Sequence, residues 1–395
     1  MHILHVTLGF LPAISWGGPV KIVHQNCKEL VNRGYQVTIY CTNLLNKKQK
    51  IKPGTFEQNI DGIRVVYMDA VNLRWWPGTL GPIWLPDLSS YLKREINSFD
   101  IVHLNGYRSP VMLSAARAAR FAGVPIVTQP HGTLPIKISS FFLKRAYDQF
   151  FGKMELDGIR CIITLQDSER LQAIAHGVPE NRIEVMPNGI DTHERDNLPA
   201  KGCFRQRYKI TPDAPVILFV GRINKIKGTD MLIEAFSLMN DPTAHLVIVG
   251  PDDGQYKEVV SLIKSHGLSN SVTITGLVSD EEKKAAFIDS DIYVLPSRSD
   301  AFPTTIMESC LMGIPMVITD RCEIASILKH KVAEVVPFDA QAFANAMRSL
   351  LTDKERYKNY KSNTQAMVAD TFSIKAVVDR LESIYQHVTA AEEYR

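Results

Sequence analysis

Two cationic side chains, Arg222 and Lys227, flank a short loop that follows the apolar segment 216–220. Because this loop comes directly after an expected strand and before a helical pattern, both cations can point at one spot above a sheet. A forked guanidinium and a compact ammonium together suit a diphosphate. A solvated basic loop is the alternative for such a pair, and the position after a strand disfavours it.

A second polar group follows the apolar segment 292–295. Pro303 suits the first position of a helix, so the N–H groups of Thr304 and Thr305 are expected to lie free as a phosphate cradle. Asp300 precedes this helix, and Glu308 lies about one and a half turns inside it. We expect Asp300 to guard the site and Glu308 to accept hydrogen bonds from a pair of hydroxyls, as acidic residues do with ribose. A solvated helix face is the alternative interpretation of Glu308.

The N-terminal half holds a glycine pair, Gly17 and Gly18, directly before a helical pattern. Adjacent glycines let backbone N–H groups approach an anion, and the start of a helix adds its dipole; a flexible turn is the alternative. His131 follows the expected strand 125–128, where a histidine is either a site residue or a hydrogen-bonded structural group. The dinucleotide fingerprint G-x-G-x-x-G is absent after the first strand, which counts against an NAD enzyme.

The triplet Asp289-Ser290-Asp291 has the pattern of a metal-binding Asp-x-Asp. It immediately precedes the apolar segment 292–295, where Asp291 fits the end of a helix or a turn. Since Arg222 and Lys227 already supply the charge that a metal would bring, we expect no metal site.

The elements that must hold these residues are short apolar runs alternating with longer helical patterns from end to end. This alternation is typical of parallel sheets covered on both faces, and it occurs in two series separated by a polar stretch. We therefore predict an α/β protein with two doubly wound, Rossmann-like domains that face each other across a cleft. The expected divisions are an N-terminal domain at 1–190, a linker at 191–213, a C-terminal domain at 214–372, and a final helix at 373–395 that packs back toward the N-terminal domain.

Composition narrows the class of protein further. The 395 residues carry 45 basic and 42 acidic side chains, a net charge of +3, which is too small for a protein whose main partner is nucleic acid. The six cysteines form no Cys-x-x-Cys pair, as expected of free thiols in a reducing compartment. No apolar run reaches the ~18–20 residues of a membrane span. We expect a cytoplasmic protein that reaches at most the inner surface of a membrane.

One basic and aromatic segment, Lys137–Lys153, has the pattern of a helix that lies on anionic lipid. Lys137, Phe141, Lys144 and Arg145 share one face at helical spacing. An amphipathic helix that packs on its own sheet is the alternative.

Taken in order, these motifs resemble the retaining glycosyltransferases of family 4, which have the GT-B fold. The resemblance covers nearly the whole chain and depends on the order and spacing of five motifs. They are Gly17-Gly18, Pro130-His131-Gly132, Pro187-Asn188-Gly189-Ile190-Asp191, the stretch Gly221 to Gly228, and the pair of acidic residues Asp300 and Glu308.

The resemblance implies a role for each candidate residue. Arg222 and Lys227 correspond to the pair that binds the diphosphate of a nucleotide-sugar donor, and Glu308 to the carboxylate that holds the ribose. Asp300 and His131 correspond to residues near the donor sugar. Backbone groups around Val278 match the stretch that lies against the base, and Gly17 and Gly18 the loop that approaches the phosphate. One departure concerns donor identity: the family commonly has Glu-Gly-Phe-Gly where this chain has Asp300-Ala301-Phe302-Pro303.

Together with this resemblance, the sequence predicts a glycosyltransferase that needs neither a metal nor a cofactor. We expect it to move a hexose from a UDP- or GDP-linked donor to the hydroxyl of a sugar or a lipid-linked acceptor, with retention. The expected setting is polysaccharide or glycolipid synthesis. Nucleic acid is not an expected partner. Two alternatives stay open: a nucleotide-sugar epimerase of similar twin-Rossmann plan, and a non-catalytic nucleotide-sugar-binding subunit.

Overall fold

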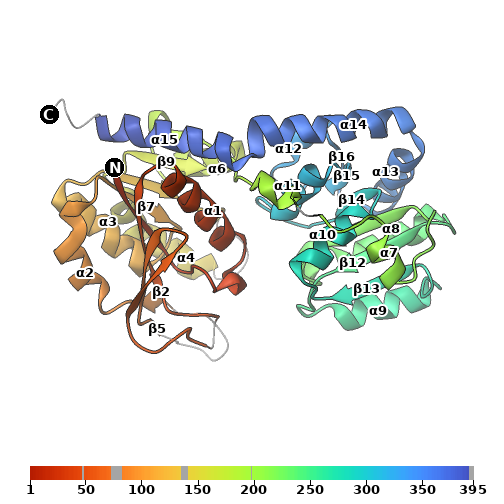
Figure 1. Ribbon diagram of the computed structural model, residues 1–395, viewed down its shortest axis with the longest axis horizontal. Coiled ribbons are helices and arrows are strands. Elements are labelled where there is room, and N and C mark those ends of the chain that lie inside the picture. The colour runs from red at the N-terminus through yellow and green to blue at the C-terminus, as the bar shows by residue number, and fades with distance from the viewer. Residues whose placement is uncertain (47–48, 73–81, 135–140, 197, 391–395) are drawn as a thin grey trace. The chain divides into compact units, whose positions relative to one another are not determined.

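The structure, a computed structural model, describes residues 1–46, 49–72, 82–134, 141–196 and 198–390. The chain forms two compact units (Figure 1). The units do not correspond simply to the first and second halves of the sequence. The first unit is Met1–Gly189 together with Ile374–Arg395, and the second is Ile190–Ser373. The chain therefore passes between the units twice.

The first unit is built on an eight-stranded sheet of order β10-β9-β8-β7-β1-β2-β4-β3. All neighbours are parallel except β3 and β4, which form an antiparallel hairpin. The central strands are buried along their length, as their continuous apolar runs predict. The hairpin was not predicted, because β3 is largely exposed and polar. The strands are β1 (His2–Thr7), β2 (Gln36–Thr42), β3 (Phe56–Ile60), β4 (Ile63–Met68), β7 (Ile101–Asn105), β8 (Ile126–Gln129), β9 (Cys161–Thr164) and β10 (Ile183–Val185), beside a small pair, β5 (Val71–Asn72) and β6 (Ile83–Trp84).

Helices cover both faces of this sheet and enclose two apolar cores. Side chains of α2 and α3 fill the core on one face, and side chains of α1 and α15 fill the core on the other. The helices of this unit are α1 (Gly18–Asn32), α2 (Leu88–Glu95), α3 (Pro110–Ala122), α4 (Phe141–Tyr147), α5 (Lys153–Leu156), α6 (Asp167–Ala175) and α15 (Ile374–Ala390).

The C-terminal helix α15 is an integral part of the first unit. It packs beside α1, and the Arg33 guanidinium at the end of α1 lies 2.6 Å from the Asp379 carboxylate and 2.5 Å from that of Glu382. Seven of its side chains are buried, a large share of one of the two cores. They are Ile374, Val377, Val378, Leu381, Ile384, Tyr385 and Val388.

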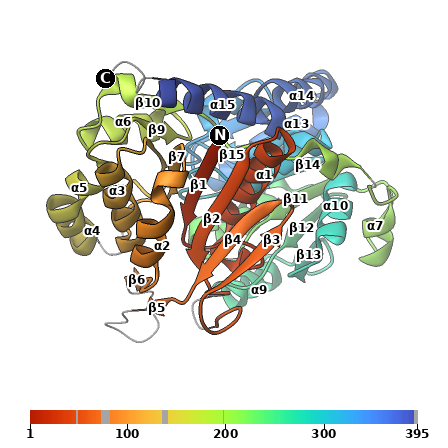
Figure 2. The same cartoon turned by 60° about the vertical axis from the view of Figure 1, so that its left-hand side comes forward.

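The second unit is a doubly wound domain on a six-stranded parallel sheet of order β13-β12-β11-β14-β15-β16. Figure 2 labels β11, β12, β13, β14 and β15 of this sheet. Helix α8 packs on α9 and α13, and α11 packs on α10 and α14. The strands are β11 (Val216–Val220), β12 (His245–Val249), β13 (Val272–Gly276), β14 (Ile292–Leu295), β15 (Met316–Thr319) and β16 (Ala333–Val336); the helices are α7 (Cys203–Arg207), α8 (Thr229–Met239), α9 (Tyr256–Ser265), α10 (Asp280–Ile288), α11 (Thr304–Met312), α12 (Ala325–Leu328), α13 (Ala340–Thr352) and α14 (Lys354–Met367).

The stretch 191–213, expected as a linker, belongs to the second unit instead. The Asp289 carboxylate accepts hydrogen bonds from the backbone N–H groups of Gly202, Phe204 and Arg205, and it thereby holds the start of α7. The Phe204 side chain is buried. Because α7 has only five residues, its apolar pattern was too short to stand out from a polar linker.

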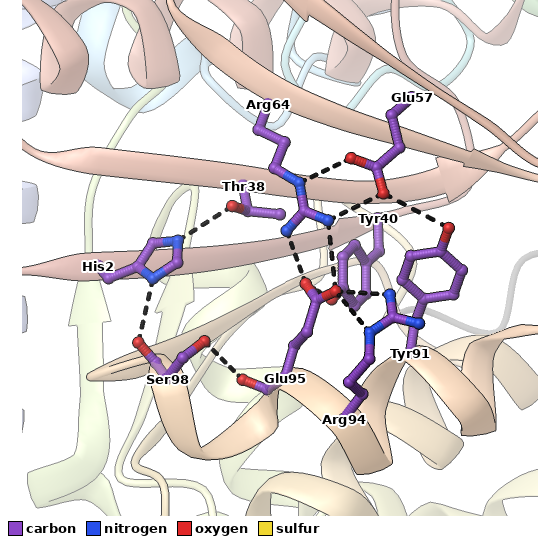
Figure 3. A network of polar contacts seen from close by, with 9 residues as sticks. All are labelled: His2, Thr38, Tyr40, Glu57, Arg64, Tyr91, Arg94, Glu95 and Ser98. Carbon is purple, nitrogen blue, oxygen red and sulfur yellow. Dashed lines mark hydrogen bonds and ion pairs between the residues drawn. The ribbon is translucent and has the colours of Figure 1, made fainter.

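A polar network joins α2 to the neighbouring strands of the first sheet (Figure 3). Its centre is Glu95, whose carboxylate accepts hydrogen bonds from the Tyr40 hydroxyl at 2.8 Å and the Arg64 guanidinium at 2.6 Å. Arg64 also contacts Glu57, and Arg94 contacts Glu95. The hydrogen bonds from Arg64 outweigh burial and hold the pKa of Glu95 at about 2, against an ordinary 4.5.

This network predicts how stability changes with pH. Since the pKa of Glu95 is lowered in the folded protein, its stabilisation is present above pH 4.5 and is lost as the pH falls toward about 2. We expect Glu95→Gln to lower the free energy of unfolding by about 1–2 kcal/mol at pH 7 and to flatten its decline between these pH values. Urea unfolding across this range measures both effects. Asp157→Asn is the control, because the Asp157 side chain is 63 % exposed. It should change neither the free energy of unfolding at pH 7 nor its decline at lower pH. Equal pH dependence in wild type and Glu95→Gln would contradict the assignment.

Candidate active site

The candidate residues of the second unit gather at the carboxyl ends of its parallel strands, on the loops that follow β11, β13 and β14. Because these strands are parallel, all three loops lie at the same edge of the sheet, which is where open α/β sheets bind ligands. The structure therefore places these candidate residues at one edge of the sheet, as the strand-end rule predicts.

The loop after β11 is held by the side chain of Asn224. Asn224 accepts a hydrogen bond from the Lys227 backbone N–H at 2.9 Å and closes a tight turn. Gly228 then starts α8 with a φ of +71°, and a Cβ atom there would lie 2.0 Å from the Pro296 carbonyl oxygen. Only glycine allows the loop after β11 to approach the loop after β14 this closely.

Arg222 projects from this loop with 61 % of its side chain exposed. Its guanidinium lies 2.6 Å from the Asp253 carboxylate, which also accepts a hydrogen bond from the Asn224 side chain at 2.8 Å. Asp253 follows β12 and was not among the predicted residues, although its position after a strand could have revealed it. The contact holds Arg222 toward the β12 side of β11 and leaves guanidinium N–H groups for an anion.

Lys227 turns to the other side of β11, where its ammonium donates a hydrogen bond to the Asp300 carboxylate. Both side chains are largely buried, at 18 % and 16 % exposure. Ser297 contacts the same carboxylate at 3.4 Å. The structure thus joins two predicted residues directly. Asp300 neutralises and orients the ammonium, which retains N–H donors for a further anion.

Glu308 lies inside α11 with its side chain 8 % exposed, so the expected alternative of a solvated helix face is wrong. Its carboxylate accepts a hydrogen bond from the Lys283 ammonium at 3.0 Å. Burial alone would lower the pKa of Lys283, but the carboxylates of Glu308 and Asp280 together outweigh it and raise that pKa. Lys283 lies in the middle of α10, away from any strand end, so nothing in the sequence marked it.

The N-terminus of α11 faces the same edge. Pro303 caps the helix, and α11 begins one residue later than predicted, at Thr304. The first N–H groups of a helix lack intrahelical acceptors, so those of Thr304 and Thr305 are oriented as the sequence predicts. The Thr305 hydroxyl accepts a hydrogen bond from the buried Tyr293 hydroxyl at 2.6 Å, which fixes the first turn.

Val278 lies in the loop between β13 and α10, at the same edge of the sheet. The loop leaves β13 through Gly276, whose φ is +73°. The Gly276 carbonyl accepts a hydrogen bond from the Gly250 N–H at 2.9 Å. Leu277, beside Val278, is 81 % exposed. This loop is therefore exposed at the carboxyl edge of the sheet.

Asp289 and Asp291 act on the protein's own backbone. Asp289 holds α7, as described above, and the Asp291 carboxylate accepts a hydrogen bond from the Val216 N–H at 2.7 Å and contacts the Arg205 guanidinium at 3.2 Å. Both lie before β14, at the edge of the sheet opposite the loops that follow the strands. Their hydrogen bonds give this Asp-x-Asp triplet a structural role.

The remaining candidates belong to the first unit. Gly17 caps α1 with a φ of +93°, and Gly18 is the first residue of that helix, as predicted. His131 follows β8 with a φ of +52°, an uncommon value for a residue other than glycine. Its Nε2 lies 3.3 Å from the Asn105 side-chain oxygen, and burial lowers its pKa to about 4. The imidazole is therefore neutral at pH 7.

Comparison with known proteins identifies this architecture. Residues 16–194 match the family model described as Glycosyltransferase Family 4, and residues 202–367 match the model described as Glycosyl transferases group 1. The two α/β domains and the solved structures that share them place the chain in the GT-B fold class of glycosyltransferases. The chain belongs to glycosyltransferase family 4.

Individual relatives agree with this assignment. The chain is 26 % identical to the alpha-D-kanosaminyltransferase of Streptomyces kanamyceticus, over 80 % of this chain and 83 % of the relative. It is 28 % identical to the putative teichuronic acid biosynthesis glycosyltransferase TuaC of Bacillus subtilis, over 88 % of each. It is 24 % identical to the O-antigen chain mannosyltransferase C of Escherichia coli, over 98 % of each.

Solved structures share the fold. A glycosyltransferase from Rickettsia africae has a TM-score of 0.76 at 19 % identity, with 98 % of each chain covered. Anabaena HepE in complex with UDP has a TM-score of 0.76 at 18 % identity, with 98 % of this chain and all of that one covered. The predicted α/β fold of GT-B type is confirmed.

Proposed function

We propose that this glycosyltransferase moves a hexose from a nucleoside-diphosphate sugar to an acceptor hydroxyl with retention at the anomeric carbon. The single observation that carries the proposal is the pair of cations after β11, each held by a carboxylate: Arg222 by Asp253 and Lys227 by Asp300. Cations fixed in advance stabilise a departing diphosphate without reorganising during the reaction. The same fold binds UDP and UDP-glucose in HepE, which supports a nucleotide-sugar donor.

The proposed reaction breaks the bond between the anomeric carbon and the donor phosphate. The acceptor hydroxyl attacks from the face that the phosphate leaves, and the departing phosphate oxygen takes the hydroxyl proton. Arg222, Lys227 and the N–H groups of Thr304 and Thr305 stabilise the negative charge that collects on the diphosphate. Glu308 accepts hydrogen bonds from the ribose, and the loop at Val278 lies against the base. No metal or cofactor takes part in this scheme.

The test is release of nucleoside diphosphate from a panel of UDP- and GDP-sugars, with and without acceptor sugars or lipid-linked sugars. NMR of the product then reports its anomeric configuration. We expect release that depends on the acceptor, a linkage with the configuration of the donor, and full activity in EDTA. Conversion of the donor to its epimer without an acceptor would instead identify an epimerase. Binding without turnover of any donor would identify a non-catalytic subunit.

The relatives guide the choice of acceptor. Their names refer to teichuronic acid biosynthesis and to O-antigen chains. We therefore extend the proposal to polysaccharide or glycolipid synthesis in the cytoplasm, at the inner face of the membrane.

The segment Lys137–Lys153 is the proposed membrane contact, of which residues 137–140 lie outside the described part of the chain. Among its described side chains, Leu143 is 75 % exposed and Phe150 68 %, and Arg145 is exposed beside them. Exposed apolar groups among cations suit anionic lipid. No helix in the described ranges is long and apolar enough to cross a membrane. Co-sedimentation with anionic but not neutral vesicles tests the contact, and Phe150→Ser should weaken it.

Lys283 gives a test of donor binding that is independent of the diphosphate cations. Without its ammonium, the buried Glu308 carboxylate loses the partner that orients it toward the ribose. We expect Lys283→Met to raise the KM for the donor about tenfold and to leave kcat nearly unchanged, because ribose contacts are made equally in ground and transition states. Lys284→Met, at the next position in α10, is the control. An unchanged KM in a folded Lys283→Met protein would argue against the role of Glu308.

A further inference from the structure

A chain of polar side chains runs through the first unit from His131 to the C-terminal helix. His131 Nε2 lies 3.3 Å from Asn105 Oδ1, and Asn105 Nδ2 lies 3.2 Å from His5 Nδ1. His5 Nε2 then lies 3.4 Å from the Tyr385 hydroxyl, which lies 2.5 Å from His103 Nδ1. Four of the five side chains, all except His131, are buried to 7 % exposure or less.

The backbone around Asn105 fixes which way its amide points. Asn105 Nδ2 lies 3.3 Å from the carbonyl oxygens of Val6 and His103, which can only accept hydrogen bonds. The NH₂ group must therefore face these carbonyls and His5, and the amide oxygen must face His131. Since an amide oxygen accepts, His131 Nε2 carries the proton.

The same reasoning fixes which group donates in each of the following hydrogen bonds. His5 Nδ1 accepts from Asn105, so its Nε2 donates to the Tyr385 oxygen, and the Tyr385 hydroxyl donates to His103 Nδ1. Burial lowers the pKa of His5 to about 3 and lowers that of His103 as well, with a further contribution from the neighbouring histidines. All three imidazoles are neutral at pH 7, so the chain holds one arrangement of protons.

The loop that carries His131 is held from several sides at once. The Gly132 N–H donates a 2.8 Å hydrogen bond to the buried Glu169 carboxylate, which also accepts from the Leu165 N–H at 2.9 Å. The Arg108 guanidinium donates to the carbonyls of Thr133 and Leu134. These contacts hold His131 at its φ of +52°, and strain maintained in this way is typical of functional sites. Among the described residues, Glu169 and Arg108 are the charged groups that hydrogen-bond to this turn.

We propose that Asn105 locks His131 in the tautomer with a proton on Nε2 and a lone pair on Nδ1, so that Nδ1 accepts a hydrogen bond from a sugar hydroxyl. His131 Nδ1 is buried and has no hydrogen-bond partner among the described residues, as expected of an acceptor reserved for a ligand. Asn105 is a positioning residue, and His5 and Tyr385 orient it in turn. The inference rests on the proposed function through the sugar, whereas the tautomer can be measured without any substrate.

The first experiment reads the tautomer directly. Protein labelled with ¹⁵N-histidine is studied by long-range ¹H–¹⁵N NMR, and the His131 signals are assigned by their loss in His131→Asn. We expect a protonated Nε2, an unprotonated Nδ1, and no protonation of the ring down to about pH 5. In Asn105→Ala the ring should become a mixture of tautomers. The opposite tautomer in wild type, or an unchanged signal in Asn105→Ala, would overturn the inference.

The second experiment separates positioning from mere stability. Asn105→Ala should lower kcat about 10–100-fold and leave the donor KM nearly unchanged. Asn105→Asp keeps an acceptor for Nε2–H but adds a negative charge, so it should raise the pKa of His131 and move the acid limb of the kcat/KM profile upward by more than one pH unit. An acid limb that stays in place would overturn the inference.

Three further variants complete the design. Tyr385→Phe, which keeps the packing of α15 and removes the hydroxyl, should lower kcat about 2–5-fold. Tyr40→Phe removes a hydroxyl bonded to Glu95 in the same unit and should change stability alone. If His131→Ala transferred sugar at the wild-type rate, His131 Nδ1 would have no role as an acceptor and the inference would fail. If no donor were turned over by wild type, the proposed function would fail instead, and the NMR experiment would still decide the tautomer.

Discussion

Lys227→Ala is expected to lower kcat about 10²–10³-fold while the protein stays folded. The ammonium lies at the carboxyl edge of the second sheet, and the Asp300 carboxylate already orients it before any ligand arrives. Loss of one preorganised group that stabilises charge in the transition state costs about 3–4 kcal/mol of activation free energy. Steady-state release of nucleoside diphosphate measures the effect.

Stability must be measured beside activity, because the variant leaves Asp300 largely buried without its cation. The double variant Lys227→Met with Asp300→Asn removes both charges, so it should recover stability and leave kcat low. Lys225→Ala is the matched control: this lysine lies in the same turn, but its ammonium contacts Asp230 and Glu258, at 3.2 and 3.6 Å. Wild-type turnover by a folded Lys227→Ala protein would refute the proposed leaving-group site.

Gly228→Ala is expected to reduce the free energy of unfolding by about 3–5 kcal/mol, or to prevent folding of the second unit. The added methyl would lie 2.0 Å from the Pro296 carbonyl oxygen and 3.1 Å from the Phe338 ring, at a backbone φ of +71°. Neither a backbone carbonyl at a strand end nor a packed ring can yield that much space. Chemical unfolding of the purified variant, or its soluble yield, is the measurement.

Gly254→Ala separates the clash from the conformational strain. Gly254 has a φ of +98° in the nearby loop after β12, but nothing lies within 4 Å of an added Cβ. This variant should lose only about 1 kcal/mol. Similar losses in the two variants would mean that the close approach of the loops contributes little.

Strands β11 and β14 of the second sheet were predictable because they are buried along their length and read as continuous apolar runs. The exposed hairpin strand β3 has no such run and was missed. The short α7 was missed for a related reason, since five residues give too little periodicity to distinguish a helix from a polar connection.

In the candidate site, too, some features were predictable from the sequence and others were not. The strand-end rule placed Arg222, Lys227 and Asp300 at one edge of a sheet, but it did not reveal which carboxylate holds which cation. These pairs join residues 31 and 73 positions apart, and that choice depends on how neighbouring loops fold against each other. Lys283 shows the limit most clearly, because a lysine in the middle of a helix is unremarkable until Glu308 is packed against it.

The return of α15 to the first unit determines when that unit can be completed. During synthesis the residues up to Gly189 leave the ribosome first, but the core they build still lacks the side chains of Ile374–Ala390. Its apolar surface must therefore stay uncovered until the whole second unit has been translated. A nascent chain halted before residue 374 would present that surface to chaperones and proteases, even though every strand of its first sheet had already been made.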